Sequence, residues 1–414
     1  MTKIAQLIPS RFLADDIKSI INNDLIAKSR LEPFSELEIN FLNQLSKEIL
    51  TDSATSRMPE LVALAYFLRK ANIKKIVDNF LSTLPHSEIV VPLGICFQIA
   101  PSNVDTIFMY SWAFSLLAGN TNIIRITQNV GEQLSNLISV VNRVINFSEM
   151  KEIAERNIIL SYPYDDNINS YLSSKADLRI IWGGDATVQN IRKHLAKPTT
   201  RDIAFADKIS YSVIDSKAFL EMNQEAQIEK ARLFYNDSYY FDQMACSSPQ
   251  VVFFVGSDDE NKSASLIFWE KLEEILNSVQ HNEHISVSMN KLAYLYEESA
   301  IGMDLKIISE INSSKPVIVE IDKSGVSKIE NICGGGYFHQ CFINDLTELQ
   351  ALIKENDQTL SYIGFNSEML KNLARLLNGK GIDRIVPVGQ ALAFMQTWDG
   401  FSLLNHFTKR VVVI

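Results

Sequence analysis

Short apolar runs of β-forming residues alternate with helical patterns through much of this 414-residue chain. Between residues 88 and 205 the clearest runs are NIIRI (122–126), NIILS (157–161) and LRIIW (178–182). A continuous apolar run of this length is typical of a strand that is buried on both faces. Because parallel strands need a crossover between them, the alternation predicts βαβ units and a doubly wound parallel sheet.

The rest of the chain is also regular. Apolar residues at helical spacing predict N-terminal helices over 36–50 and 60–81. Further strands are expected at 208–215, 250–256, 317–322, 338–344 and 362–365. Further helices are expected at 223–234, 263–279, 347–354 and 368–377, and a loop at 235–246. No Gly/Ser-rich or Pro-rich linker separates the two halves, so we expect two closely packed α/β domains.

Charge and hydropathy exclude several classes of protein. The net charge is 39 − 49 = −10, which argues against a general nucleic-acid binder but permits a local basic pocket. Residues 106–124 are uncharged, yet AGNTN (118–122) suits a turn better than hydrocarbon, so no membrane span is expected there. With no signal peptide and only four cysteines, none in a C-x-x-C pair, a reducing cytoplasm is expected.

Cys246 is the first candidate catalytic residue. It lies in FDQMACSSPQ (241–250), a polar, turn-forming segment just before an apolar strand, where nucleophiles are often presented. A thiolate there attacks a carbonyl carbon and holds the acyl group as a thioester. A small packing residue is the commoner role of a cysteine, and we assign that role to Cys96, Cys333 and Cys341.

Two loops after predicted strands carry further candidates. Asn103, in APSNV (100–104), is placed either to donate its amide to an oxyanion or to cap the next helix. Gly183 and Gly184 precede a helix, as in sites where backbone N–H groups bind a phosphate. The same Gly-Gly-Asp sequence is also an ordinary turn, in which the Asp185 carboxylate is expected to cap the helix.

A cation and two smaller motifs complete the candidates. Arg125 stands at the end of an apolar strand, which indicates either an anionic ligand or a solvent-facing strand end. The Gly334–Gly336 run is interpreted as a mobile loop rather than a phosphate site. His281 and His284 have no further ligand nearby in sequence, so no metal site is expected.

Taken in order, these segments resemble the aldehyde dehydrogenase superfamily. The resemblance rests on Pro101-Ser102-Asn103, Leu117–Asn120 followed by Arg125, Gly183-Gly184 and Gln243-x-x-Cys246. Within the superfamily, the chain is most similar to the acyl-CoA reductase (LuxC) family, the fatty acyl reductases of bacterial bioluminescence. This closer resemblance is carried by segments 67–70, 205–210, 235–250, 384–389 and 398–400, and it covers about residues 50–410.

The resemblance implies an aldehyde dehydrogenase-like α/β fold. A Rossmann-type dinucleotide-binding domain would span 1–208 and 385–414, and a catalytic domain would span 209–384, with the site in the cleft between them. The apolar C-terminus RVVVI (410–414) is expected to add an edge strand to a neighbouring copy and so form a homo-oligomer.

The resemblance also assigns catalytic roles. Cys246 would be the acylated nucleophile, and Asn103 would form the oxyanion hole with the backbone N–H of Cys246. Hydrolytic members carry a general-base glutamate where this chain has Ala204. Without a positioned base, water competes poorly for the acyl-enzyme, which then survives until hydride arrives.

Cofactor-binding residues are implied in the same way. Gly183 and Gly184 would lie beside the dinucleotide pyrophosphate, with Ser102 nearby. Arg125 matches the lysine that contacts the adenosine ribose and, with Gln128 where NAD-preferring members carry an acid, it favours NADPH. The Glu-x-Phe-Gly-Pro motif that holds the nicotinamide ribose has no clear match, and the Gly334–Tyr337 region is where its counterpart is expected.

The reaction implied is the NADPH-dependent reduction of a fatty acyl thioester, acyl-CoA or acyl-protein, to the aldehyde through an acyl-cysteine. An acyl-protein synthetase is a candidate partner. A CoA-acylating, NAD-dependent aldehyde dehydrogenase is the nearer alternative, and a non-catalytic nucleotide-binding scaffold is the more distant one. Bioluminescence is not implied, because fold and chemistry do not determine the fate of the aldehyde.

Overall fold

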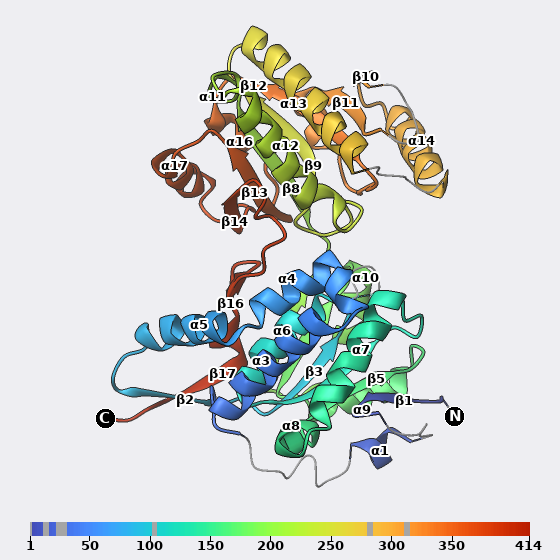
Figure 1. Ribbon diagram of the computed structural model, residues 1–414, viewed down its shortest axis with the longest axis vertical. Helices are drawn as coiled ribbons and strands as arrows, with labels where there is room; N and C mark the ends of the chain where they lie inside the picture. The colour runs from blue at the N-terminus through green and yellow to red at the C-terminus, as the bar shows by residue number, and fades with distance from the viewer. Residues whose placement is uncertain (1, 11–15, 22–30, 102–105, 280–284, 310–314) are drawn as a thin grey trace. The chain divides into compact units, whose positions relative to one another are not determined.

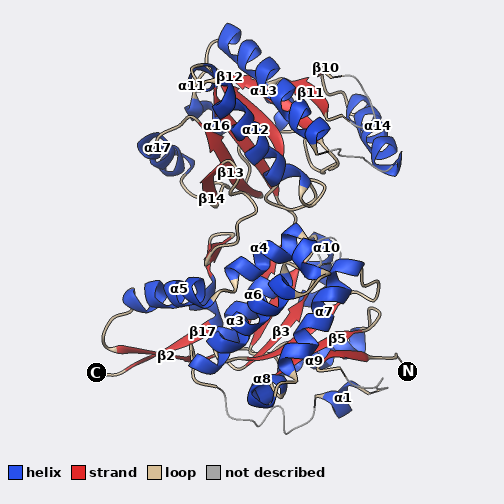
Figure 2. Ribbon diagram, viewed as in Figure 1, coloured by secondary structure: helices blue, strands red, loops and turns tan. Residues whose placement is uncertain are grey.

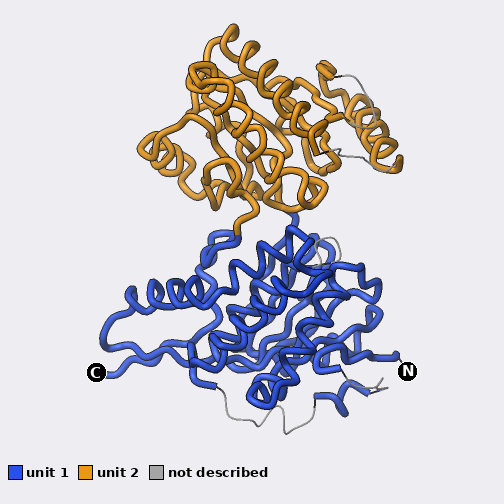
Figure 3. Tube along the Cα trace, in the orientation of Figure 1, with its two compact units in different colours: residues 1–207, 394–414 blue, residues 208–393 orange. Residues whose placement is uncertain are grey.

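The computed structural model describes residues 2–10, 16–21, 31–101, 106–279, 285–309 and 315–414. The chain divides into two compact units, which Figure 3 shows in different colours. Unit 1 comprises residues 1–207 and 394–414, and unit 2 comprises residues 208–393. Residues 385–393, expected in the first domain, therefore belong to unit 2, because the strand at their start pairs within the sheet of that unit.

Unit 1 is built on a six-stranded sheet in the order β1-β5-β4-β3-β6-β7. Its strands are β1 (Ala5–Ile8), β3 (Ile95–Ile99), β4 (Thr121–Ile126), β5 (Asn157–Ser161), β6 (Leu178–Trp182) and β7 (Arg201–Phe205). Neighbouring strands are parallel except for β1 and β5, which confirms the predicted βαβ units. Numbered along the chain, the parallel strands β3 to β7 have the doubly wound order 3-2-1-4-5, which reverses between β3 and β6.

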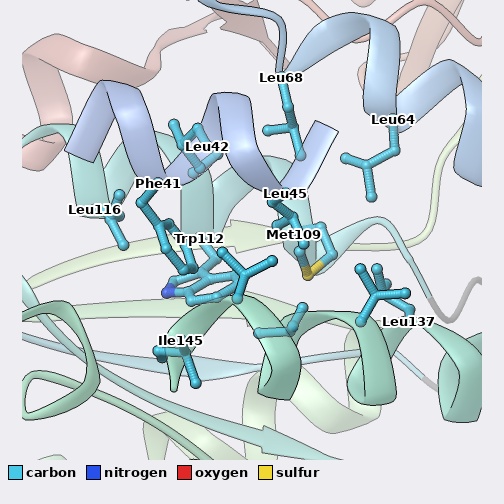
Figure 4. Close-up of a cluster of buried hydrophobic side chains, with 14 of the residues drawn as sticks. Phe41, Leu42, Leu45, Leu64, Leu68, Met109, Trp112, Leu116, Leu137 and Ile145 are labelled. Carbon is cyan, nitrogen blue, oxygen red and sulfur yellow. The ribbon is translucent and has the colours of Figure 1, made fainter. Parts of the chain in front are cut away.

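Helices cover both faces of this sheet (Figure 2). They are α1 (Ile17–Ile20), α3 (Glu36–Thr51), α4 (Pro59–Phe67), α5 (Lys70–Ser82), α6 (Phe108–Leu117), α7 (Glu132–Ile145), α8 (Lys151–Ala154), α9 (Asp166–Lys175) and α10 (Asp185–Arg192). A further helix of this unit, α18 (Leu403–Phe407), packs on α6. Short 3₁₀ helices lie at Thr55–Arg57 and Ser148–Met150. Figure 4 shows the larger core, where Trp112 of α6 packs edge to face with Phe41 of α3 at 5.9 Å between ring centroids. Burial on both faces explains why these strands are continuous apolar runs.

The second N-terminal helix predicted from the sequence is in fact two helices, α4 and α5. Arg69 between them is extended, with φ −57° and ψ 137°. The Asn72 side chain donates to the Phe67 carbonyl at 2.7 Å, and the Lys70 N–H donates to Asn43 Oδ1 at 3.1 Å. Side chains thus satisfy backbone groups that a continuous helix would pair, which apolar periodicity cannot reveal.

The C-terminal segment returns to unit 1 as two small sheets. β15 (Thr397–Trp398) and β16 (Phe401–Ser402) form a hairpin whose turn residues, Asp399 and Gly400, have positive φ of 48° and 72°. This is the Asp-Gly turn that two-residue hairpins favour. β17 (Thr408–Val412) pairs antiparallel with β2 (Glu88–Pro92). The C-terminal strand, expected to pair with a neighbouring copy, is therefore paired along one edge within its own chain.

Unit 2 contains a seven-stranded sheet in the order β10-β11-β12-β9-β8-β13-β14, parallel except for β10 and β11. Its strands are β8 (Ile209–Asp215), β9 (Pro249–Val255), β10 (Leu305–Ile307), β11 (Val317–Ile321), β12 (Tyr337–Ile343), β13 (Asp357–Ile363) and β14 (Arg384–Pro387). β9 lies at the centre of the sheet, between β8 and β12.

Helices also cover both faces of the second sheet. One face is covered by α11 (Ser216–Leu220), α12 (Gln224–Tyr239) and α13 (Asp258–Ser278), and Figure 1 shows α12 and α13 side by side. The other face is covered by α14 (Ile285–Ala300), α15 (Lys323–Val326), α16 (Leu349–Leu352) and α17 (Ser367–Leu377), with a 3₁₀ turn at Leu346–Glu348. Alternate strand residues point into the two cores, as the pleat of a sheet requires.

The uncharged stretch 106–124 forms α6, a turn and the first part of β4, as predicted. Across the described part of the chain, no helix has both the length and the apolar character needed to cross a membrane.

Candidate active site

Cys246 lies in the connection between α12 and β9. The loop predicted at 235–246 begins later, because α12 continues to Tyr239 and buries Asp237 and Ser238 in the protein interior. We call residues 240–248 the cysteine loop. Cys246 itself is half-buried, three residues before the central strand begins. A thiol on a loop that enters a central strand is accessible from outside while its backbone is held by the sheet.

The backbone of Cys246 is fixed by a buried serine of β8. The Ser210 hydroxyl donates to the Cys246 carbonyl oxygen at 2.6 Å and accepts from the Thr359 N–H of β13 at 3.1 Å. Ser210 is fully buried, so both bonds are shielded from water. Two strands of the sheet therefore define where the carbonyl of the candidate nucleophile lies.

Gln243 forms the second attachment of the cysteine loop. Its side-chain Nε2 donates to the carbonyl oxygens of Pro249 and Tyr337, both at 2.9 Å. Its Oε1 accepts from the Gly336 N–H at 2.9 Å. Gln243 and the preceding Asp242 have positive φ of 62° and 49°, a conformation that residues with a Cβ rarely adopt.

The Gly334–Gly336 run packs directly against this loop. The Gly335 N–H donates to the Asp242 carbonyl at 2.8 Å. The three glycines have φ of 75°, 61° and 77°, and a Cβ at Gly334 would lie 2.9 Å from the Asp242 carbonyl oxygen. The sequence indicated a mobile loop here, whereas the structure shows a turn that needs glycine to approach the cysteine loop.

Asp237 connects the helix before the cysteine loop to a distant segment. Its Oδ2 accepts from the Gly389 N–H at 2.6 Å and its Oδ1 from the Ala391 N–H at 2.9 Å. Its backbone carbonyl accepts from the Ser248 hydroxyl at 2.8 Å. Burial raises the pKa of the Asp237 carboxyl to about 7, although those two N–H groups and the Arg384 guanidinium act to lower it.

The candidate cofactor residues of unit 1 lie at the carboxyl ends of β4 and β6, the two strands on either side of β3. Arg125 is the next-to-last residue of β4, Gln128 follows that strand and is exposed, and Gly183 and Gly184 follow β6. The strand order reverses between β3 and β6, and ligands of doubly wound sheets bind at this point. The topology thus brings these residues to one edge of one sheet.

Four residues named from the sequence lie outside the described residues: Ser102, Asn103, His281 and His284. In the sequence, the first two come after β3. Within the described ranges, no three His, Cys, Asp or Glu side chains are grouped as metal ligands.

Arg125 is held over an aromatic ring. Its Nη2 donates to the Tyr162 carbonyl at 3.3 Å, and its guanidinium carbon lies 5.2 Å from the centroid of the Tyr162 ring. The Arg125 Nε is buried and has no hydrogen-bond partner among the described residues. A buried guanidinium N–H without an acceptor fits an anionic ligand.

The turn after β6 differs from the expectation. Gly184, not Asp185, is the N-cap of α10, so the prediction that the Asp185 carboxylate caps this helix is wrong. The Asp185 N–H instead donates to Asp207 Oδ2 at 3.2 Å, and a Cβ at Gly184 would lie 2.7 Å from that oxygen. A carboxylate from the end of the next strand thus occupies the start of the helix, where a phosphate was expected.

Ala204 is the next-to-last residue of β7, opposite Ile181 of β6, and is half-buried. Its methyl group cannot accept a proton from water. The carboxyl end of β7 therefore presents no general base at this position.

Three residues of these sites were not assigned a role from the sequence: Asp207, Ser210 and Asp237. The role of each depends on a hydrogen-bond partner far along the chain, and the sequence around an isolated Asp or Ser does not indicate that partner. Gln243 was noted only as part of a motif. Its position among turn-forming residues, just before a buried strand, was the one available sign of its role.

The chain is similar to several known proteins. A family model described as "Acyl-CoA reductase (LuxC)" matches residues 23–410. A "Long-chain acyl-protein thioester reductase" from Vibrio harveyi is 26% identical over 343 residues, which cover 77% of this chain and 66% of the relative. The chain thus spans about two thirds of the length of that relative.

Among solved structures, a succinic semialdehyde dehydrogenase from Streptococcus pyogenes, in complex with NADP⁺, aligns with a TM-score of 0.66 at 11% identity. That alignment covers 99% of each chain. Aldehyde dehydrogenase 21 from Physcomitrella patens aligns with a TM-score of 0.64 at 9% identity, covering 95% of this chain and 88% of that one. At these identities the matches show the fold, which is that of the aldehyde dehydrogenases.

Proposed function

Since the chain belongs to the acyl-CoA reductase (LuxC) family, we propose that it reduces a fatty acyl thioester to the aldehyde through an acyl-cysteine. The observation that carries this proposal is the cysteine loop. It presents a half-buried Cys246, whose carbonyl is fixed by Ser210, at the entrance to a central strand. The name of the Vibrio harveyi relative supports an acyl-protein as one donor, beside acyl-CoA.

Each step of the proposed reaction is assigned to particular residues of the chain. The Cys246 thiolate attacks the thioester carbonyl carbon, and the carrier leaves with the electron pair of its C–S bond. The backbone N–H of Cys246, with Asn103, stabilises the oxyanion. A bound nicotinamide cofactor supplies the hydride that reduces the acyl thioester. Cys246 then releases the aldehyde as its C–S bond breaks and the thiolate is restored. Ala204 gives water no base with which to intercept the acyl group.

We assign the cofactor as NADPH, bound at the carboxyl edge of the sheet in unit 1. Support comes from the doubly wound strand order and from Arg125, whose buried Nε would face the 2′-phosphate. Gln128 adds no negative charge there. Because the Asp207 carboxylate occupies the start of α10 and the space beside Gly184, we propose that the pyrophosphate binds at Gly183 and Gly184 only when that carboxylate moves away.

Partners and setting follow from the same proposal. An acyl-protein synthetase is the proposed acyl donor protein, and a homo-oligomer would form through the β2–β17 sheet, which exposes Ile89 and residues 411–414. The four cysteines, all within described residues, form no disulfide with one another, as suits a reducing cytoplasm. Sedimentation of the wild type and of Val412→Asp tests the oligomer; equal sizes would contradict it.

The decisive experiment compares Cys246→Ala with Cys333→Ser, which changes the other half-buried thiol. With labelled acyl-CoA and NADPH, we expect Cys246→Ala to lose both protein acylation and aldehyde formation, and Cys333→Ser to keep both. Acylation that survives in Cys246→Ala would overturn the assignment.

An acyl-CoA chain-length panel, read by NADPH oxidation, identifies the preferred acyl group, whereas cofactor titration, the direction of turnover and thiol labelling separate the alternatives. Faster turnover from aldehyde to acyl-CoA with NAD would favour a CoA-acylating dehydrogenase. Failure of acyl-CoA to block thiol labelling of Cys246 would favour a non-catalytic scaffold.

A further inference from the structure

We infer that Gln243 is a positioning residue, whose buried side-chain amide sets the place of the Cys246 thiol. The inference rests on the proposed role of Cys246 as nucleophile. Gln243 is completely buried, three positions before the cysteine, and joins the cysteine loop to the amino ends of two neighbouring strands, β9 and β12.

Both the nitrogen and the oxygen of the Gln243 side-chain amide form hydrogen bonds. Nε2 donates to Pro249, which begins β9, and to Tyr337, which begins β12, while Oε1 accepts from the Gly336 N–H. Removing these bonds would leave two carbonyls and one N–H without partners in the interior. Such losses are costly because a buried polar group cannot recover its hydrogen bond from water.

The backbone at Gln243 is held as firmly as its side chain. Its carbonyl accepts from the Gln250 side chain at 2.9 Å, and the neighbouring Asp242 carbonyl accepts from the Gly335 N–H at 2.8 Å. Both Gln243 and Asp242 are left-handed, at a cost of about 1 kcal/mol each for residues with a Cβ. These bonds compensate that cost, so without the amide we expect the two residues to relax toward ordinary φ values.

Such a relaxation would move the thiol. Only Met244 and Ala245 separate Gln243 from Cys246, and both take part in tight turns: the Met244 N–H donates to the Phe241 carbonyl at 2.8 Å, and the Ala245 carbonyl accepts from the Ser248 N–H at 2.9 Å. Ser210 holds only the carbonyl side of Cys246. A displacement of about 1 Å in a reacting group lowers its rate on the order of 100-fold.

The test compares Gln243→Met and Gln243→Glu with a matched control, Gln227→Met. Gln227 is a buried glutamine of the same unit, and its Nε2 donates to the Phe219 carbonyl at 3.0 Å, away from the cysteine loop. Gln243→Glu keeps an acceptor for the Gly336 N–H but sets a second oxygen against two carbonyls. The Gln243→Glu variant keeps the inference testable if Gln243→Met does not fold.

Three quantities are measured in each protein. They are the single-turnover rate of Cys246 acylation by acyl-CoA, the rate of Cys246 alkylation by iodoacetamide read from its peptide mass, and the KM for NADPH. We expect the acylation rate to fall about 10- to 100-fold in the Gln243 variants. The rate of Cys246 alkylation should change as well, whereas the KM for NADPH should stay within about 2-fold of the wild-type value. In Gln227→Met we expect all three to stay close to the wild type even if melting falls.

Equal acylation rates in Gln243→Met and Gln227→Met would overturn the inference and reduce Gln243 to a structural role. If the proposed function is wrong, the result is different, because the wild type itself is then not acylated at Cys246. In that case the alkylation rate still decides whether Gln243 positions the thiol.

Discussion

The carboxylate of Asp237 accepts a hydrogen bond from the Gly389 N–H at 2.6 Å, across 152 residues of chain. Asp237 is also joined through its carbonyl to Ser248, at the end of the cysteine loop. One buried acid therefore links the helix that precedes the candidate nucleophile, the loop that carries it and the segment by which the chain leaves unit 2.

Asp237 should make stability depend on pH. Burial raises its pKa from 3.8 to about 7 in the folded protein, so the folded state binds this proton more tightly than the unfolded state. The stabilisation of the folded state by this tighter proton binding is complete below about pH 4, decreases as the pH rises and is lost above about pH 7. We expect the free energy of unfolding in urea to fall between pH 5 and pH 7, and this slope to disappear in Asp237→Asn. A slope that persists in the variant would assign it to another group.

Arg125→Glu should weaken NADPH binding more than NADH binding. Reversing the charge removes the donors proposed for the 2′-phosphate and adds repulsion, so we expect the KM for NADPH to rise about 10- to 100-fold and that for NADH much less. Arg192→Glu, at an exposed arginine of the same unit, is the control and should change neither. Equal losses for the two cofactors would remove the assignment of Arg125 to the phosphate.

Ala204→Glu should introduce hydrolysis of the acyl-enzyme. A carboxylate at this half-buried position supplies the base that water lacks, and a positioned general base contributes about 100-fold or more. We expect fatty acid release from acyl-CoA without NADPH to rise, and the yield of aldehyde to fall. No increase in fatty acid would show that this side chain does not face the acyl group.

Comparison of Gly336→Ala with Gly379→Ala distinguishes the effect of a steric overlap from the effect of an unfavourable backbone conformation. Both glycines have positive φ, 77° and 85°, so each substitution costs about 1 kcal/mol of stability for the conformation alone. A Cβ at Gly336 would also overlap the Tyr239 side chain, whereas at Gly379 it would meet no atom within 4 Å. We expect Gly336→Ala to lose more stability in urea and to slow Cys246 alkylation, and Gly379→Ala to leave alkylation unchanged. Similar alkylation in both would contradict the packing role.

Arg179→Met should destabilise unit 1. The buried guanidinium donates to both carboxylate oxygens of Asp202 at 2.6 Å and to two backbone carbonyls. Removing it leaves these acceptors without a partner, at a cost of about 3 kcal/mol. The control is Arg375→Met, whose ion pair with Glu368 is solvent-exposed and should matter by less than about 0.5 kcal/mol. Urea unfolding of both variants checks the difference.

The sequence alone determined the alternation of strands and helices and indicated the chemistry. The strands at 157–161 and 178–182 were predicted with the bounds that the structure shows, because strands buried on both faces leave an uninterrupted apolar run. Cys246 could be singled out because its polar, turn-forming context is written in adjacent residues. The family could be recognised for the same reason, since its motifs are short and contiguous.

Tertiary structure decided what depends on partners far apart in the chain. Gln243 meets Gly336 across 93 residues, and Asp207 reaches the start of α10 from the next strand. Apolar periodicity records which face of an element is buried, but it contains no information about which donor meets which acceptor after folding. The role of the Gly334–Gly336 run, the cap of α10 and the fixed place of Cys246 are therefore properties of the folded chain, because each depends on a hydrogen bond or a close contact that only folding creates.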